Sequence, residues 1–159
     1  MNAVFRLFVL LFLCCSIASA QTTTMRVDEL SKSSDIVVVG KVHRVAAEWD
    51  ASHSRIVTRV TLAVDQTVKG TSGGTVTLTV PGGEVGSVGE WYSHSPQFKE
   101  NEDVLVFAQK DARGTLRVTA GNSGKFTLQR DEHTGLRMLP NGMPLDALTK
   151  QIKASGGGN

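Results

Sequence analysis

Hydrophobic and polar residues alternate along much of the chain with a period of two, which is typical of β-strands. The clearest case is residues 55–68, where polar side chains occupy one face and the other face carries Ile56, Val60, Leu62, Val64 and Val68. Residues 36–39 form an unbroken β-branched run, and Gly40 interrupts a strand that resumes through Val45. A glycine at position 40 predicts a bend or bulge. A strand as long as that expected over residues 55–68 is typical of barrels.

Further strands are expected at 75–80, 103–109, 116–120 and 126–130, each separated from the next by a turn. A brief helix is expected at 25–33. A second one is expected after Pro144, because Leu145, Leu148 and Ile152 lie at helical spacing. The pattern therefore predicts a mainly β protein, an antiparallel OB-like barrel or small sandwich with a short N-terminal and a short C-terminal helix.

The first twenty residues have the pattern of a signal peptide. Arg6 supplies the positive charge, residues 7–13 are an apolar run, and Ala18 and Ala20 place small residues at the cleavage position. We expect cleavage after Ala20 and export to the periplasm or the extracellular space. We also expect a single β-barrel-like domain over residues 21–155 and a flexible tail over 156–159.

Charge and cysteine content narrow the partners of the exported chain. It would carry sixteen basic residues against fifteen acidic ones, scattered without a basic stripe, which argues against nucleic acid as a partner. No later segment has the length of a membrane span. Both cysteines, Cys14 and Cys15, lie in the predicted signal peptide, so no disulfide or thiolate site is expected after cleavage.

Residues 80–98 combine glycines at 82, 83, 86 and 89 with a group of aromatic and polar side chains. The predicted ligand-binding residues are Glu84, Glu90, Trp91, Tyr92 and His94. Adjacent strand residues point to opposite faces, so at most one of the two neighbouring aromatic residues belongs to the core. The interpretation we favour places Trp91 in the core with Tyr92 at its edge; the alternative leaves an aromatic side chain exposed beside the glycine loop.

Catalytic and metal-binding motifs are incomplete. Val85 stands where a nucleophile elbow around Ser87 needs glycine, and Phe126 stands where a phosphate loop after Lys125 needs Ser or Thr. The four histidines have no metal-ligand spacing. We therefore assign no catalytic residue, no metal site and no cofactor.

Two resemblances rest on short motifs. Ser34-Asp35 before a valine-rich strand, a Val-Lys-Gly ending at Gly70, the Pro-Gly-Gly at 81–83 and the proline and aromatic residue at 96–98 resemble an uncharacterised family of secreted bacterial proteins. That resemblance implies no activity. Asp35 to Gly40, followed by a long strand that ends at Val68-Lys69-Gly70, also resembles netrin and TIMP-like modules, which implies an OB-type barrel. The protease-inhibitor mechanism of that group needs an N-terminal cysteine, whereas the predicted mature chain begins with Gln21.

The predicted function is a non-catalytic secreted or periplasmic binding or accessory module. Its partner would be an envelope or extracellular protein, peptide or glycan, contacted through the glycine-rich loop at 82–95. The alternative is a small envelope hydrolase or metal-dependent enzyme that uses His94, Glu90 or Ser87. It requires those three side chains to meet in one pocket.

Overall fold

A computed structural model describes residues 27–156 of the chain. It is mainly β, with antiparallel sheets and, in the described residues, the α-helices α2 (Val27–Lys32) and α3 (Leu145–Gly156). The predicted signal peptide lies outside these residues. So do residues 157–159 of the predicted tail, whereas Gly156 is the last residue of α3.

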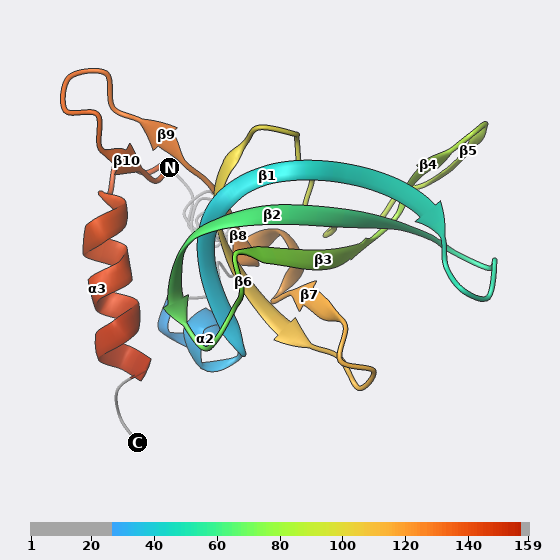
Figure 1. Ribbon diagram of the computed structural model, residues 1–159, viewed down its shortest axis with the longest axis horizontal. Helices are drawn as coiled ribbons and strands as arrows, with labels where there is room; N and C mark the ends of the chain where they lie inside the picture. The colour runs from blue at the N-terminus through green and yellow to red at the C-terminus, as the bar shows by residue number, and fades with distance from the viewer. Residues whose placement is uncertain (1–26, 157–159) are drawn as a thin grey trace, which may run out of the picture.

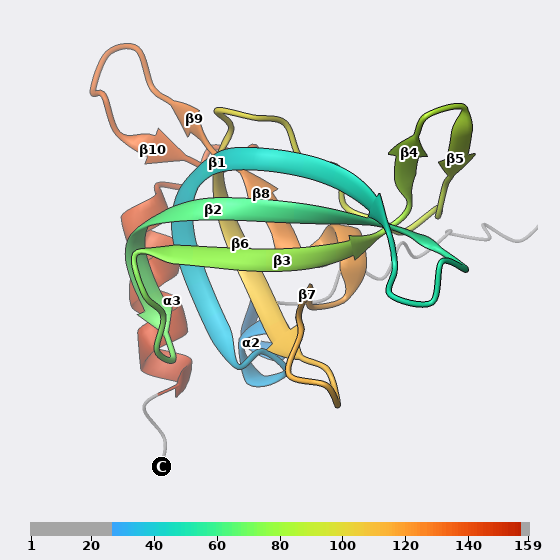
Figure 2. The ribbon, with the colours of Figure 1, turned by 45° about the vertical axis from the view of Figure 1, so that its right-hand side comes forward.

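The main sheet has six strands. Its path runs from β3 (Thr75–Pro81) through β2 (Ile56–Lys69) and β1 (Ile36–Trp49) to β6 (Asp103–Lys110) and β7 (Leu116–Val118), and β8 (Lys125–Thr127) also pairs with β6. Figures 1 and 2 show β1 and β2 bending strongly around the body of the sheet, with the edge strands β3 and β7 close together. No backbone ladder joins these two edges in the described part of the chain.

Two small ribbons extend from this sheet. The first pairs β4 (Gly83–Val85) with β5 (Val88–Glu90), and the second pairs β9 (Gln129–Arg130) with β10 (Arg137–Met138). The prediction of one strand over 126–130 is wrong in part, because this segment is divided between β8 and β9. It divides at Leu128, because this side chain is buried in the core and its N–H donates to the carbonyl of Asp103. A short 3₁₀ helix, η1 (Gly121–Gly124), precedes β8.

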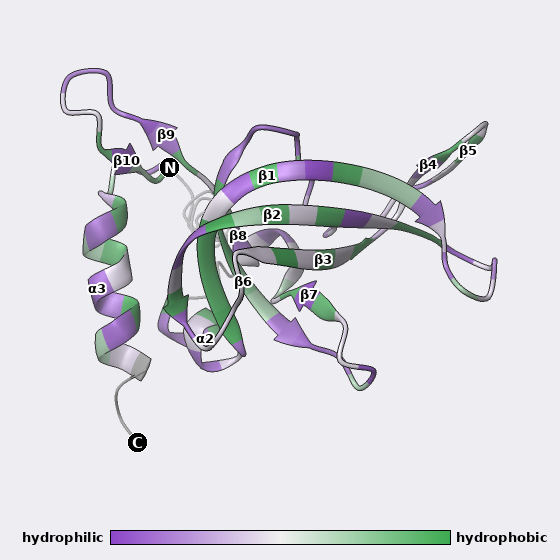
Figure 3. Cartoon of the chain, viewed as in Figure 1, coloured by the Kyte–Doolittle hydropathy of each residue, from purple (hydrophilic) through white to green (hydrophobic). Residues whose placement is uncertain are grey.

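β1 is buried on both faces over its first half, which explains the unbroken run of β-branched residues. Val37 and Val39 face a core that α2 and α3 cover, together with Leu105 and Phe107 of β6. Ile36, Val38 and Val42 face a second core, enclosed by the curved sheet; its other buried members are Val60, Leu62, Val76, Leu78, Val80, Val104, Val106 and Ala108. Figure 3 shows these hydrophobic stretches along β1 and β6, with polar residues on the outlying loops.

The predicted irregularity at Gly40 is confirmed. The pairing of β1 with β2 shifts between Val39 and Gly40, so that Asp65 is skipped in the register. A Cβ atom on Gly40 would lie 2.2 Å from the carbonyl oxygen of Ala63. Only glycine allows the two strands to approach this closely, and the bulge adds to the bend of the sheet.

The Ser-Asp and Val-Lys-Gly motifs meet at one corner of the fold. Lys69 Nζ donates to the backbone carbonyls of Ser31 and Ser34, the latter at 2.7 Å. Gly70 has φ of 74°, and a Cβ there would lie 2.3 Å from the carbonyl oxygen of Asp35. The Asp35 carboxylate in turn accepts from the Lys110 N–H at 2.6 Å. The two motifs therefore fix the end of α2 against the sheet.

Replacing Lys69 by methionine is expected to lower the free energy of unfolding by about 1–2 kcal/mol, because two carbonyls at the end of α2 lose a charged donor. Chemical denaturation followed by circular dichroism measures this change. Lys150→Met is the matched control, since Lys150 is exposed and has no polar partner among the described residues. Equal stability of the two variants would contradict the role given to Lys69.

Candidate functional site

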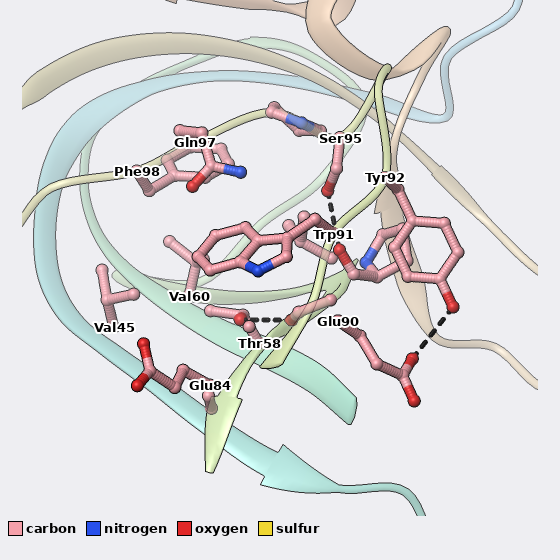
Figure 4. Close-up of a pocket in the computed structure, with 16 residues that line it drawn as sticks. Val45, Thr58, Val60, Glu84, Glu90, Trp91, Tyr92, Ser95, Gln97 and Phe98 are labelled. Carbon is pink, nitrogen blue, oxygen red and sulfur yellow. Dashed lines mark hydrogen bonds between the residues drawn. The ribbon is translucent and has the colours of Figure 1, made fainter. Parts of the chain in front are cut away.

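Residues 82–84, 90–92 and 95–98 line a cleft of about 290 Å³. The β4–β5 ribbon, which contributes to it, stands at the end of the molecule opposite α3 (Figure 1). One wall comes from β1, β2 and the end of β3. The rest of the lining comes from the base of the β4–β5 ribbon and from residues 91, 92 and 95–98. Its floor is apolar, formed by Val45, Val60, Val80 and Phe98. Figure 4 shows Trp91 in the middle of the cleft, with the Glu84 and Glu90 side chains also at the cleft.

Two glycines direct the chain from β3 into the β4–β5 ribbon. Gly82 and Gly83 have φ of 89° and 135°, which residues with a side chain rarely adopt. A Cβ on Gly82 would lie 2.6 Å from the carbonyl oxygen of Glu90, and one on Gly83 would lie 2.5 Å from Thr58 Oγ1. The Thr58 hydroxyl donates to the Gly82 carbonyl at 2.7 Å. The loop therefore has a defined backbone path.

The ribbon itself closes through a two-residue turn at Gly86 and Ser87. Gly86 has φ of 62°, and glycine at the first turn position is typical of a type II′ hairpin. Glu84 lies opposite Gly89 and Gly83 opposite Glu90 in the ladder. Ser87 is thus a turn residue at the tip of an exposed ribbon.

Trp91 is 72% exposed, so the interpretation that placed its side chain in the core is wrong. Its indole lies beside Gly89: a Cβ there would be 3.2 Å from Nε1 and within 4 Å of two further ring atoms. Absence of a side chain at position 89 leaves room for the ring. The large hydrophobic core residues come instead from the strands of the main sheet and from α2 and α3, and Trp91 lines the cleft.

Tyr92 lies at the boundary of the cleft and is 39% exposed. Its hydroxyl donates to Glu90 Oε2 at 3.0 Å and accepts from Arg55 Nη1 at 3.2 Å. These bonds orient both the phenol ring and the Glu90 carboxylate. Tyr92 also lines a neighbouring hollow, so it forms a wall shared by two depressions.

His94 belongs to the neighbouring hollow and not to the cleft of Trp91. That hollow, about 370 Å³, lies between β3 and β7 and includes Arg117. The imidazole Nδ1 is 3.0 Å from the Ser93 hydroxyl, and the His94 carbonyl accepts from the Asn122 N–H at 3.1 Å. Four of the five predicted ligand-binding residues therefore meet in one cleft, Glu84, Glu90, Trp91 and Tyr92.

Sequence reasoning missed two hydroxyl residues that hold the cleft together. Thr58 lies near the start of β2, and Ser95 is buried behind the loop, where its Oγ donates to the Pro81 carbonyl at 2.7 Å. The Ser95 N–H also donates to the Tyr92 carbonyl at 3.1 Å. A serine before proline in a loop is a known turn signal. No signal in the sequence links Thr58 to the loop at 82–95.

The side chains of the enzymatic alternative do not meet in one pocket. Ser87 lies at the ribbon tip, Glu90 in the cleft and His94 in the neighbouring hollow. Within residues 27–156, no cluster of three or more His, Cys, Asp or Glu side chains is placed to hold a metal ion. The geometry gives this alternative no support.

Over the same residues, no helix combines the length and the apolar character that a membrane crossing requires. No protein-family model matches the chain, and no curated protein matches its sequence.

Proposed function

We propose that this protein is an exported, non-catalytic binding module that contacts an extracytoplasmic partner through the cleft of Trp91. In this proposal the curved sheet is a partly open OB-type barrel, with β3 and β7 as its facing edges. The order of the strands and the approach of these two edges support that description. The sequence resemblances to the secreted bacterial family and to netrin and TIMP-like modules agree with it.

The exposed indole is the observation that carries the proposal. Burial of a large aromatic side chain is strongly favourable, and buried tryptophans are frequent hot spots of interfaces. Here the indole lies in a cleft whose backbone is fixed by Gly82, Gly83 and the Thr58 and Ser95 hydrogen bonds. A preformed cleft with an exposed aromatic residue loses little conformational entropy when it binds a ligand.

Trp91→Ala is expected to weaken binding by about 30-fold, equivalent to roughly 2 kcal/mol at an interface hot spot. Its free energy of unfolding should stay within about 0.5 kcal/mol of the unchanged protein, since the side chain is exposed. A displayed library of random peptides and a panel of immobilised oligosaccharides provide the ligands. Affinities for the ligands selected on the unchanged protein are then measured for each variant.

Leu136→Ala is the matched control, because Leu136 is an exposed hydrophobic residue (49%) outside the cleft. It should retain the selected ligands. If Trp91→Ala retains them equally well, or if no ligand is selected at all, the cleft is not the binding site that we propose.

A further inference from the structure

The side-chain hydroxyl groups of the cleft already act as hydrogen-bond donors to other groups of the protein. Thr58 donates to the Gly82 carbonyl, Ser95 to the Pro81 carbonyl and Tyr92 to Glu90 Oε2, at 2.7, 2.7 and 3.0 Å. A hydroxyl has one O–H, so once this O–H donates a hydrogen bond, the group can only accept further ones. The side-chain donors left in the lining are the Trp91 indole N–H and the Gln97 amide. The cleft is therefore rich in acceptors.

The charged side chains of the lining are both acidic. Glu84 has no hydrogen-bond or ion-pair partner among residues 27–156, and Glu90 accepts one bond, from Tyr92. The lining contains neither lysine nor arginine. Arg55 contacts it from the outside, through the Tyr92 hydroxyl. Two carboxylates beside an apolar floor favour a positively charged ligand group.

The Trp91 indole adds a third feature. A cation within about 6 Å of an indole face is attracted by the electron density of the ring, and tryptophan is the strongest of the aromatic residues in this respect. Trp91 is 72% exposed and lines the cleft with both carboxylates, so we expect a bound cation to contact the ring as well as a carboxylate.

We propose that the cleft binds an arginine or lysine side chain of a partner polypeptide; this inference rests on the proposed function of the same cleft. Guanidinium and ammonium groups are donors without acceptors, which matches a lining of carboxylates and committed hydroxyls. Their aliphatic stems fit the apolar floor of Val45, Val60 and Phe98. A neutral sugar hydroxyl needs acceptors and donors alike, so it fits this lining less well.

The test uses short capped peptides with one central residue: arginine or its neutral isostere citrulline, and lysine or acetyl-lysine. Binding is followed by NMR through the indole N–H signals of the two tryptophans, with Trp49→Phe identifying that of Trp91. At low ionic strength, the arginine or lysine peptide should shift the Trp91 signal with an affinity at least about tenfold higher than its neutral counterpart. The ratio should fall in about 0.5 M salt, where charges are screened.

The double replacement Glu84→Gln and Glu90→Gln should remove the preference for the charged peptide. Comparison of the charged and neutral peptides uses the unchanged protein, so the inference stays testable if the variant does not fold. Equal affinity of arginine and citrulline peptides, or tighter binding of N-acetylchitotriose than of the arginine peptide, would overturn the inference. In either case, ligand binding that depends on Trp91 would still support the proposed function. If there is neither a preference for the charged peptide nor binding that depends on Trp91, both the inference and the proposed function are wrong.

Discussion

Replacement of Glu102 by glutamine is expected to lower the free energy of unfolding at pH 7 by about 2–3 kcal/mol. Glu102 Oε1 lies 2.7 Å from Lys125 Nζ, and the two side chains are only 13% and 11% exposed. Thr127 Oγ1 donates to the same carboxylate oxygen, and the Lys99 N–H donates to Oε2. Removing one member of such a pair leaves the other charge with little water to solvate it. The loss is below that of a fully buried pair, because Lys125 also donates to the Gln97 carbonyl.

The same group predicts a pH dependence. Burial opposes ionisation of Glu102 and is the largest single influence, but the hydrogen bonds from Lys125, Thr127 and Lys99, with the attraction of the Lys125 charge, together outweigh it and lower its pKa. A carboxyl group whose pKa is lowered by folding stabilises the folded state above its unfolded pKa, near 4.5. This stabilisation is lost as the pH falls through the lower folded value.

Urea denaturation at a series of pH values measures both effects. The difference between the unchanged protein and Glu102→Gln should be complete near neutral pH and should shrink as the pH falls below that unfolded value. Glu132→Gln is the matched control, since it removes the same charge from an exposed side chain without a polar partner in the described residues. A Glu102→Gln variant as stable as this control would show that the pair contributes nothing.

Gly40→Ala is expected to cost about 3 kcal/mol, the upper part of the range for an added methyl group in a closely packed site. The new Cβ would lie 2.2 Å from the Ala63 carbonyl oxygen and 3.2 Å from the Val64 Cα. These are backbone atoms, so no side-chain rotation relieves the overlap. The strands must separate at the bulge, where β1 and β2 bend around the inner core.

Gly74→Ala is the control for this experiment. Gly74 lies just before β3, and a Cβ there would have no atom within 4 Å. Guanidinium denaturation of both variants separates the cost of the contact at position 40 from the general effect of replacing glycine. Similar midpoints for the two alanine variants would mean that the sheet accommodates the methyl group without strain.

The sequence predicted most of the sheet because its strands are long and regularly patterned. Residues 55–68 became β2 almost unchanged, and Gly40 was identified by its position inside a β-branched run. The full length of β1, to Trp49, was missed because residues 46–48 are small or polar and alternate weakly. The strands of β4 and β5 have three residues each, too few for a pattern to appear.

The site was predictable as a region but not as a geometry. Glycines and aromatic residues marked 82–94, whereas the orientation of Trp91 depends on the missing side chain at Gly89. The support of the cleft by Thr58 and Ser95 depends on contacts between residues far apart in the chain. Tyr92 and Ser95 line both the cleft and the neighbouring hollow, whereas His94 lines the hollow alone. The local sequence does not specify this difference between neighbouring residues.

The tip of the β4–β5 ribbon contributes to neither hydrophobic core, and Figure 2 shows it standing away from the body of the sheet. Apart from Gly86, whose positive φ disfavours a side chain, substitutions at the tip disturb neither core, while the glycines at its base keep the backbone in place. Related chains could acquire different ligand preferences by varying this ribbon alone, on an unchanged scaffold.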